Sequence, residues 1–254
     1  DRMVFEDALS IYSNDPDESV LNIFLISEIP PPDIDVSPTE FSVQLGQGES
    51  STQTLTISNT GYAPLEVELT IPETVTDIDG NVYETVQIGE QLWMKENLKV
   101  THYNDGTDIP TGYSGDDWIN LSTGAYAVYD DNESNADTYG YLYNWYAVET
   151  GNLAPEGWHV PTDEEWTELT NYLGGTSIAG GKMKECTEGS CPESEYWDFP
   201  NTGATNESGF IGLPGGYRFN SNGHYSSMGY SGYFWSSTES NNNNVWHREL
   251  NYNT

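Results

Sequence analysis

The chain has 254 residues, enough for one or two domains with a sizeable core. Aromatic residues make up 13% of it, including 8 Trp and 18 Tyr, which excludes a disordered acidic tail. Its 41 Asp and Glu against 7 Lys and Arg give a net charge of -34, which disfavours nucleic acid and anionic membrane surfaces as partners. No run of about 18 apolar residues is present, so we expect no membrane insertion.

The first predicted unit, residues 1–72, contains neither Trp nor Cys. Two β-rich runs, 8–12 and 20–25, flank the turn-forming residues 13–17, so we expect a β-hairpin there. Further strands are predicted at 40–45, 52–58 and 64–71. We expect no helix in this unit.

The sequence of this first unit resembles parts of two Ig-like repeats of the ASPM-SPD-2-Hydin type. The stretch SIYSNDPDESVLNIFL is similar to the closing strands of such a repeat, and DIDVSPTEFSVQLGQGESSTQTLTISNTGYAPLEVELTI to the opening strands. Residues 1–28 therefore resemble the end of one repeat and 33–72 the start of the next. Either the two halves pair within the chain as a permuted sandwich, or each pairs with a neighbouring chain and builds a fibre by strand complementation.

The second predicted unit, residues 73–254, opens on VTDIDGNVYETVQI. Asp79 and Gly80 lie between alternating apolar positions, which indicates a tight hairpin turn. Asp77 and Asp79, one residue apart, are also candidate Ca²⁺ ligands, although the other positions of an EF-hand are absent. Both interpretations stay open at this point.

One helix is predicted after Thr162, because Thr162 followed by Glu165 forms a capping box. The apolar face of this helix consists of Trp166, Leu169 and Leu173. Glycines 174 and 175 are expected to end it. A second, short helix is expected at 141–148, where apolar residues share one stripe.

Several motifs in order resemble one family of bacterial surface proteins. They are MKENLKV, YGYLYNWYAV, WHVPTDEEW, NTGATNESGFIGLPGGYR and GYFWSSTES. Together they look like the Fibrobacter succinogenes major paralogous domain, over about residues 75–254, and VPTDEEW is also similar to a segment of formylglycine-generating sulfatase modifiers. The resemblance implies a C-type-lectin-like fold with few helices and long loops, but it supplies no activity. The expected fold class is mainly β with an α+β C-terminal module: an Ig-like β-sandwich segment followed by a C-type-lectin-like domain.

The resemblance also bears on the end of the chain. Members of this family usually end with one more strand, and the sequence up to residue 254 does not contain a segment that resembles it. In a C-type-lectin-like fold the last strand pairs with the first, so we expect an edge that is open or filled by a partner.

Cys186 and Cys191 are the only cysteines and lie in a short polar stretch. We predict a disulfide between them and hence an oxidising, extracellular compartment. The redox-active cysteine pair of the sulfatase modifiers is missing, and no Ser or Cys with His and carboxylate partners can be recognised, so no catalytic residue is assigned.

Binding is the alternative to catalysis. Sugars are commonly held by aromatic faces, and the candidate ligand-binding residues are Trp118, Tyr230, Tyr233, Trp235 and Trp246; core packing is the competing interpretation of the same side chains. By analogy with acidic loops of C-type lectins, Asn206 and Glu207 are candidate metal ligands beside Asp77 and Asp79, with Ca²⁺ as the cofactor.

From these observations we expect a secreted structural or adhesive cell-surface protein, non-enzymatic, that polymerises into an extracellular fibre by β-strand complementation. The alternative is a Ca²⁺-dependent carbohydrate- or protein-binding module on an Ig-like stalk. The expected partners are accordingly other copies of the chain, joined head to tail, or a surface glycan or protein.

Overall fold

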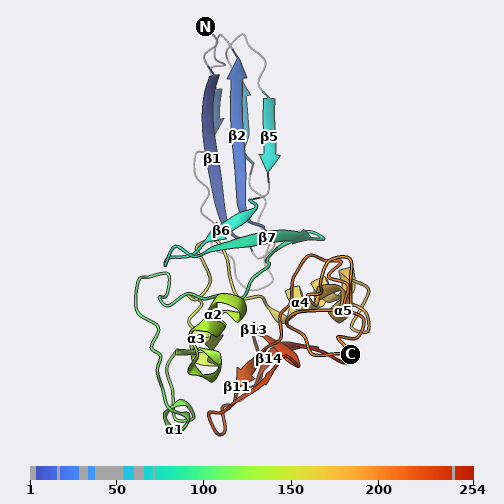
Figure 1. The fold of residues 1–254 in the computed structure, drawn as a ribbon. Helices are drawn as coiled ribbons and strands as arrows, with labels where there is room; N and C mark the ends of the chain where they lie inside the picture. The colour runs from blue at the N-terminus through green and yellow to red at the C-terminus, as the bar shows by residue number, and fades with distance from the viewer. Residues whose placement is uncertain are drawn as a thin grey trace. The chain divides into compact units, whose positions relative to one another are not determined.

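The computed structural model describes residues 4–15, 18–28, 34–37, 54–59, 66–70, 72–241 and 244–254. The chain divides into two compact units, residues 1–73 and 74–254 (Figure 1). Each unit is described by itself below. Within the described residues, none of the helices has the length and apolar character needed to cross a bilayer.

The first unit contains a three-stranded antiparallel sheet with the order β1-β2-β5. Its strands are β1 (Val4–Asp15), β2 (Glu18–Glu28) and β5 (Glu66–Thr70). A separate antiparallel pair joins β3 (Ile34–Ser37) to β4 (Thr56–Asn59). The hairpin expected from 8–12 and 20–25 is present, and β5 pairs with β2 in the same chain. The strand expected at 40–45 lies outside the described residues.

The second unit is mainly β, with three small sheets. Their strands are β6 (Thr74–Thr76), β7 (Val82–Ile88), β8 (Gln91–Met94), β9 (Tyr126–Ala127), β10 (Leu142–Tyr143), β11 (Gly215–Arg218), β12 (Tyr225–Met228), β13 (Ser231–Asn241) and β14 (Asn244–Asn251). The sheet orders are β6-β7-β8, β10-β9 and β12-β11-β13-β14, and every pairing is antiparallel except that of β11 with β13. Among the strands that the structure describes, β14 therefore forms an edge.

Short helices accompany these sheets. They are α1 (Gly115–Trp118), α2 (Ser134–Tyr139), α3 (Trp145–Glu149), α4 (Asp163–Tyr172), α5 (Ala179–Met183) and the 3-10 turn η1 (Tyr129–Asp131). The helix expected after Thr162 is α4, and both hydrogen bonds of its capping box are present. It ends before Gly174 and Gly175, whose φ angles of 106° and 91° suit glycine alone.

The helix expected at 141–148 starts later than predicted. Leu142 and Tyr143 form β10 instead, and α3 begins at Trp145. The reason is the side chain of Asn144, which accepts a hydrogen bond from the backbone N–H of Ala147 at 3.1 Å and so caps the helix at that point. The periodic apolar stripe alone did not reveal this cap.

The main core of the second unit lies under the apolar face of α4. Trp166 on this face packs against Trp93 of β8, with 4.7 Å between the ring centres. Leu169 and Leu173 are buried in the same cluster, together with Phe210. Burial of such large side chains contributes about 3–5 kcal/mol each, so α4 is held firmly and presents its opposite, polar face to solvent.

A buried lysine binds the end of β14 to this core through hydrogen bonds. The Nζ of Lys184, next to α5, donates to the backbone carbonyls of Thr202, Asn251 and Thr254, each at 2.8 Å. Its side chain is fully buried and lies 5.6 Å from the ring centre of Trp197. Two chain segments, one around Thr202 and one at 251–254, therefore converge on one ammonium group.

Candidate functional site

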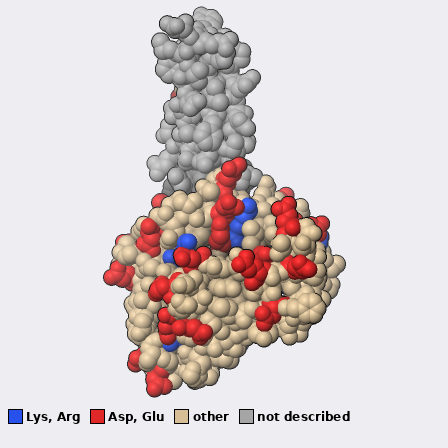
Figure 2. Space-filling model, in the orientation of Figure 1, with Lys and Arg blue, Asp and Glu red and all other residues tan. Residues whose placement is uncertain are grey.

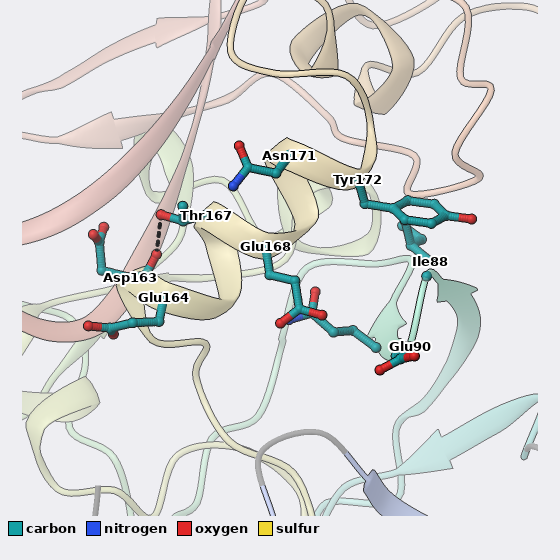
Figure 3. Close-up of a pocket in the computed structure, with 10 residues that line it drawn as sticks. Ile88, Glu90, Asp163, Glu164, Thr167, Glu168, Asn171 and Tyr172 are labelled. Carbon is teal, nitrogen blue, oxygen red and sulfur yellow. Dashed lines mark hydrogen bonds between the residues drawn. The ribbon is translucent and has the colours of Figure 1, made fainter. Parts of the chain in front are cut away.

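An open groove of about 810 Å³ lies between the polar face of α4 and the turn that joins β7 to β8 (Figure 3). Its lining residues are Ile88, Gly89, Glu90, Gln91, Asp163, Glu164, Thr167, Glu168, Asn171 and Tyr172. The groove exists because the apolar face of α4 is fixed in the core, so that the polar residues between the core positions face outward.

The helical side of the groove consists of two parallel rows of side chains. Residues spaced by four lie along one line on a helix surface. The inner row is Asp163, Thr167 and Asn171, and the outer row is Glu164, Glu168 and Tyr172.

The inner row already binds a guanidinium group from the same chain. Arg248 of β14 places Nη1 2.6 Å from Oδ1 of Asp163. Its Nη2 donates to the carbonyl of Asp163 at 3.2 Å and lies 3.4 Å from Oγ1 of Thr167. This part of the helix surface therefore has the spacing that a guanidinium group requires.

The outer row has no such partner. Glu164 and Glu168 are exposed, and no Lys or Arg in the described part of the chain pairs with them or with Glu90. Figure 3 shows Glu168 pointing from the helix toward the turn that carries Glu90. These three carboxylates therefore face solvent at the mouth of the groove, and none of the described Lys or Arg residues neutralises them.

Tyr172 closes one end of the groove. Its side chain is 66% exposed, and its ring lies on Gly89, where an added β-carbon would come within 3.1 Å of the ring. Gly89 has a φ of 67°, so both its conformation and this close contact favour glycine. One ring face is thus supported by backbone while much of the phenol stays open to a ligand.

The floor of the groove is rigid. Gln91 is buried, donates to the carbonyl of Glu165 at 3.3 Å and accepts a hydrogen bond from Nε1 of Trp93 at 3.2 Å. Ile88 belongs to the main core. The position of Glu90 relative to α4 is therefore set by buried contacts on both sides of it.

Glu165 is an acidic residue of α4 that does not take part in the groove. Both of its carboxylate oxygens lie within 2.9 Å of Nε2 of His159, and one also accepts from the N–H of Thr162. Burial alone would raise the pKa of Glu165, but these hydrogen bonds and the His159 ring hold it below its usual value. Glu165 therefore completes the capping box with Thr162, and His159 holds its carboxylate in place.

Asp77 and Asp79, expected as turn residues or as Ca²⁺ ligands, both lie in the β6–β7 turn. The Asp77 carboxylate accepts hydrogen bonds from the N–H of Asn81 at 2.9 Å and from the hydroxyl of Tyr83 at 2.6 Å. Asp79 is hydrogen-bonded to Thr101 and to Nδ1 of His102. These contacts explain both carboxylates as parts of a hairpin turn, which is one of the two interpretations of Asp77 and Asp79 drawn from the sequence.

Asn206 and Glu207, the other candidate metal ligands, have separate partners. The side chain of Asn206 accepts from the N–H of Ile211 at 3.1 Å, and Glu207 lies 3.4 Å from the ammonium of Lys182. Over the residues that are described, no group of three or more His, Cys, Asp or Glu could hold a metal ion. The structure thus gives no arrangement that unites the four predicted ligands, and Ca²⁺ stays a prediction.

The predicted aromatic ligand-binding residues are divided between core and surface. Trp118 is 7% exposed and covered by Arg218, whose guanidinium lies 4.5 Å from the ring centre. Trp235 donates to the carbonyl of Tyr143 at 2.8 Å. For Tyr233, burial and the charge of Glu249 raise the pKa to about 12. These three side chains have structural partners.

Tyr230 and Trp246 are different, because they are 48% and 47% exposed. Tyr230 packs edge to face against Tyr252, with 5.1 Å between ring centres. Both exposed rings remain available to a ligand, but neither lines the groove on α4.

Cys186 and Cys191 form the predicted disulfide. Cys186 is buried, and the six-residue stretch closed by the bond is exposed between the two cysteines. The bond closes the acidic loop that follows α5.

The groove was not predicted from the sequence, because only the capping box and the apolar face of this helix were assigned there. A signal was present: Glu164, Glu168 and Tyr172 recur every four residues on a helix whose apolar positions were correctly identified. Glu90 carries no such signal, because its approach to α4 depends on the tertiary fold.

In the comparison with protein families, the chain matches the model of the Fibrobacter succinogenes major domain over residues 86–254. Searches of curated proteins and of solved structures gave no match.

Proposed function

Because the chain belongs to the Fibrobacter succinogenes major domain family, we propose that it is an extracellular, non-enzymatic adhesive protein of the cell surface that binds its partner through the groove on α4. As part of this proposal, residues 73–254 form a C-type-lectin-like module and residues 1–72 an Ig-like segment that carries it.

The groove is the observation that carries this proposal. It combines a rigid floor, carboxylates without a counter-ion among the described residues and a half-open aromatic ring, a set suited to recognition. The disulfide and the net charge of -34 are both compatible with an extracellular location, where cations are abundant and thiols are oxidised.

Antibody labelling of intact cells that produce the protein tests the location, with permeabilised cells as the control. We expect equal labelling of both. Adhesion is tested with beads coated with the full chain, which should bind to surfaces of the same cells or their neighbours. Labelling only after permeabilisation, or beads that bind no better than albumin-coated beads, would contradict the proposal.

Self-association is a further part of the structural role. The outer strand of the first sheet, β1, is 12 residues long and, among the described strands, pairs with β2 alone. A strand from another copy could add to this edge and extend a fibre. Light scattering of the purified chain at micromolar concentration decides: polymers support strand complementation, and a stable monomer removes this part of the proposal.

A second candidate is Ca²⁺-dependent carbohydrate binding, favoured by the two exposed rings of Tyr230 and Trp246. Aromatic faces with open sides are common in sugar-binding proteins. A glycan array probed with the full chain, in CaCl₂ and in EDTA, distinguishes the candidates. A saccharide that binds only with Ca²⁺, and whose binding is lost in Trp246→Ala, would favour the lectin.

A further inference from the structure

We propose that the groove on α4 binds a basic peptide, with an arginine side chain seated between Glu164, Glu168 and Glu90 and against the ring of Tyr172. This inference deepens the proposed adhesive function, on which it rests, by naming the chemical class of the partner.

The chain itself supplies the template for this mode of binding. Arg248 occupies the inner row of α4, where its guanidinium contacts the Asp163 carboxylate and the Thr167 hydroxyl, two positions spaced by four residues. The outer row repeats that spacing with Glu164 and Glu168. A second guanidinium can therefore lie one row further out, on the same helix, with stronger acceptors.

The Lys and Arg residues that the structure describes do not fill this second position. Residues 74–254 contain six Lys and Arg, and five of them have internal partners. These are Lys95 with Glu84, Lys182 with Glu207, Arg248 with Asp163, Lys184 with three carbonyls, and Arg218 between Trp118 and Tyr225. The sixth, Lys99, forms no ion pair with Glu90, Glu164 or Glu168, so a cation bound at the outer row would come from outside the described part of the chain.

Tyr172 favours arginine in particular. A guanidinium stacks on an aromatic face as well as binding carboxylates, whereas an inorganic cation gains mainly from the carboxylates. The ring is supported by Gly89 on one side and is 66% exposed. Figure 2 shows acidic side chains over the visible face of this unit with few basic ones, a field that attracts a basic peptide from a distance.

The test uses the full chain and a fluorescein-labelled tetra-arginine peptide, blocked at both ends, measured by anisotropy in 50 mM and 300 mM NaCl. The groove variant is Glu164→Gln/Glu168→Gln. The matched control is Glu149→Gln/Glu156→Gln, which removes the same charge at exposed positions outside the groove. Circular dichroism confirms that every variant is folded.

We expect the groove variant to weaken peptide binding about tenfold and the control to weaken it less than about twofold. Tyr172→Leu should weaken it about threefold, with most of that loss retained in 300 mM NaCl, because stacking is less sensitive to salt than charge attraction. Equal losses in the groove and control variants would show attraction by the overall field alone and would overturn the inference.

Calcium provides the opposing outcome. Isothermal titration of the metal-free chain with CaCl₂ should give no heat that depends on Glu164 and Glu168. Ca²⁺ binding that the groove variant abolishes, together with no binding of tetra-arginine, would overturn the inference. The adhesive function would survive that result if intact cells are still labelled and coated beads still adhere.

Discussion

Lys184 places a positive charge in the interior, and no Asp or Glu side chain among the described residues forms an ion pair with it. Its ammonium donates to the backbone oxygens of Thr202, Asn251 and Thr254, so Lys184→Met would remove three buried hydrogen bonds, of which, within the described part of the chain, only the one to Asn251 has an alternative donor, the N–H of Thr254. We expect this variant to lose about 3 kcal/mol of unfolding free energy, measured in urea. Lys182→Met, which removes a neighbouring lysine at the surface, should lose less than about 1 kcal/mol. Equal losses would show that the carbonyl contacts contribute little.

The same lysine makes stability depend on pH. Burial lowers the pKa of Lys184 to about 8, whereas the unfolded chain keeps a value near 10.5. Between these values the unfolded state binds more protons, so this group makes the folded protein more stable as the pH rises. From pH 7.5 to 9.5 the wild type should gain on the order of 2 kcal/mol relative to Lys184→Met in urea titrations. Parallel curves for the two proteins would contradict this.

His102 shows the opposite dependence. Its Nδ1 bonds to Asp79 and its Nε2 lies 3.0 Å from Asp108, so the hydrogen bond to Asp79, and the charges of both carboxylates, raise the pKa of His102 above 6.5. The stabilisation is complete below pH 6.5 and is lost as the pH rises through the raised value. NMR titration should show this pKa falling toward 6.5 in Asp79→Asn but not in Asp137→Asn.

Helix α4 carries the groove, and its start depends on one side chain. The Oγ1 of Thr162 accepts from the N–H of Glu165 at 3.2 Å, and the Glu165 carboxylate accepts from the N–H of Thr162 at 2.6 Å. Thr162→Ala should therefore cost about 1 kcal/mol in thermal or urea unfolding, while Thr162→Ser, which keeps the acceptor, should cost about half of that or less. A Ser variant as unstable as the Ala variant would contradict a capping role.

The accuracy of sequence interpretation follows the range of the interactions involved. The β6–β7 turn and α4 were predicted correctly because Asp79-Gly80 and the Thr162 capping box act over a few residues. The predicted start of α3 was wrong because the cap that Asn144 forms, by accepting a hydrogen bond from the N–H of Ala147, outweighed a broad apolar stripe. The groove joins Glu90 to residues more than 70 positions away, and no local pattern specifies that approach.

Long-range contacts also could not be predicted from the sequence in the first unit and around the aromatic residues. Strand β5 pairs with β2 of the same chain, whereas the sequence alone left open whether these segments pair within one chain or between two. The sequence does not distinguish Trp118 and Trp235 from Trp246. The tertiary structure does, because Arg218 covers Trp118 and the carbonyl of Tyr143 accepts a hydrogen bond from Trp235. Family resemblance identified the second module without indicating where its surface is hollow.

The charge of the complete chain bears on its stability as well as its partners. With a net charge of -34, its carboxylates repel one another in the folded state. Salt screens this repulsion, because the Debye length falls from about 30 Å at 0.01 M to about 8 Å at 0.15 M. We expect the melting temperature to rise by roughly 3–6 °C between 10 mM and 300 mM NaCl. At constant ionic strength, replacing part of the NaCl by 5 mM CaCl₂ should add less than about 1 °C, because screening alone is at work. A much larger shift with CaCl₂ would demonstrate specific Ca²⁺ sites, and would favour the lectin over recognition of a basic peptide.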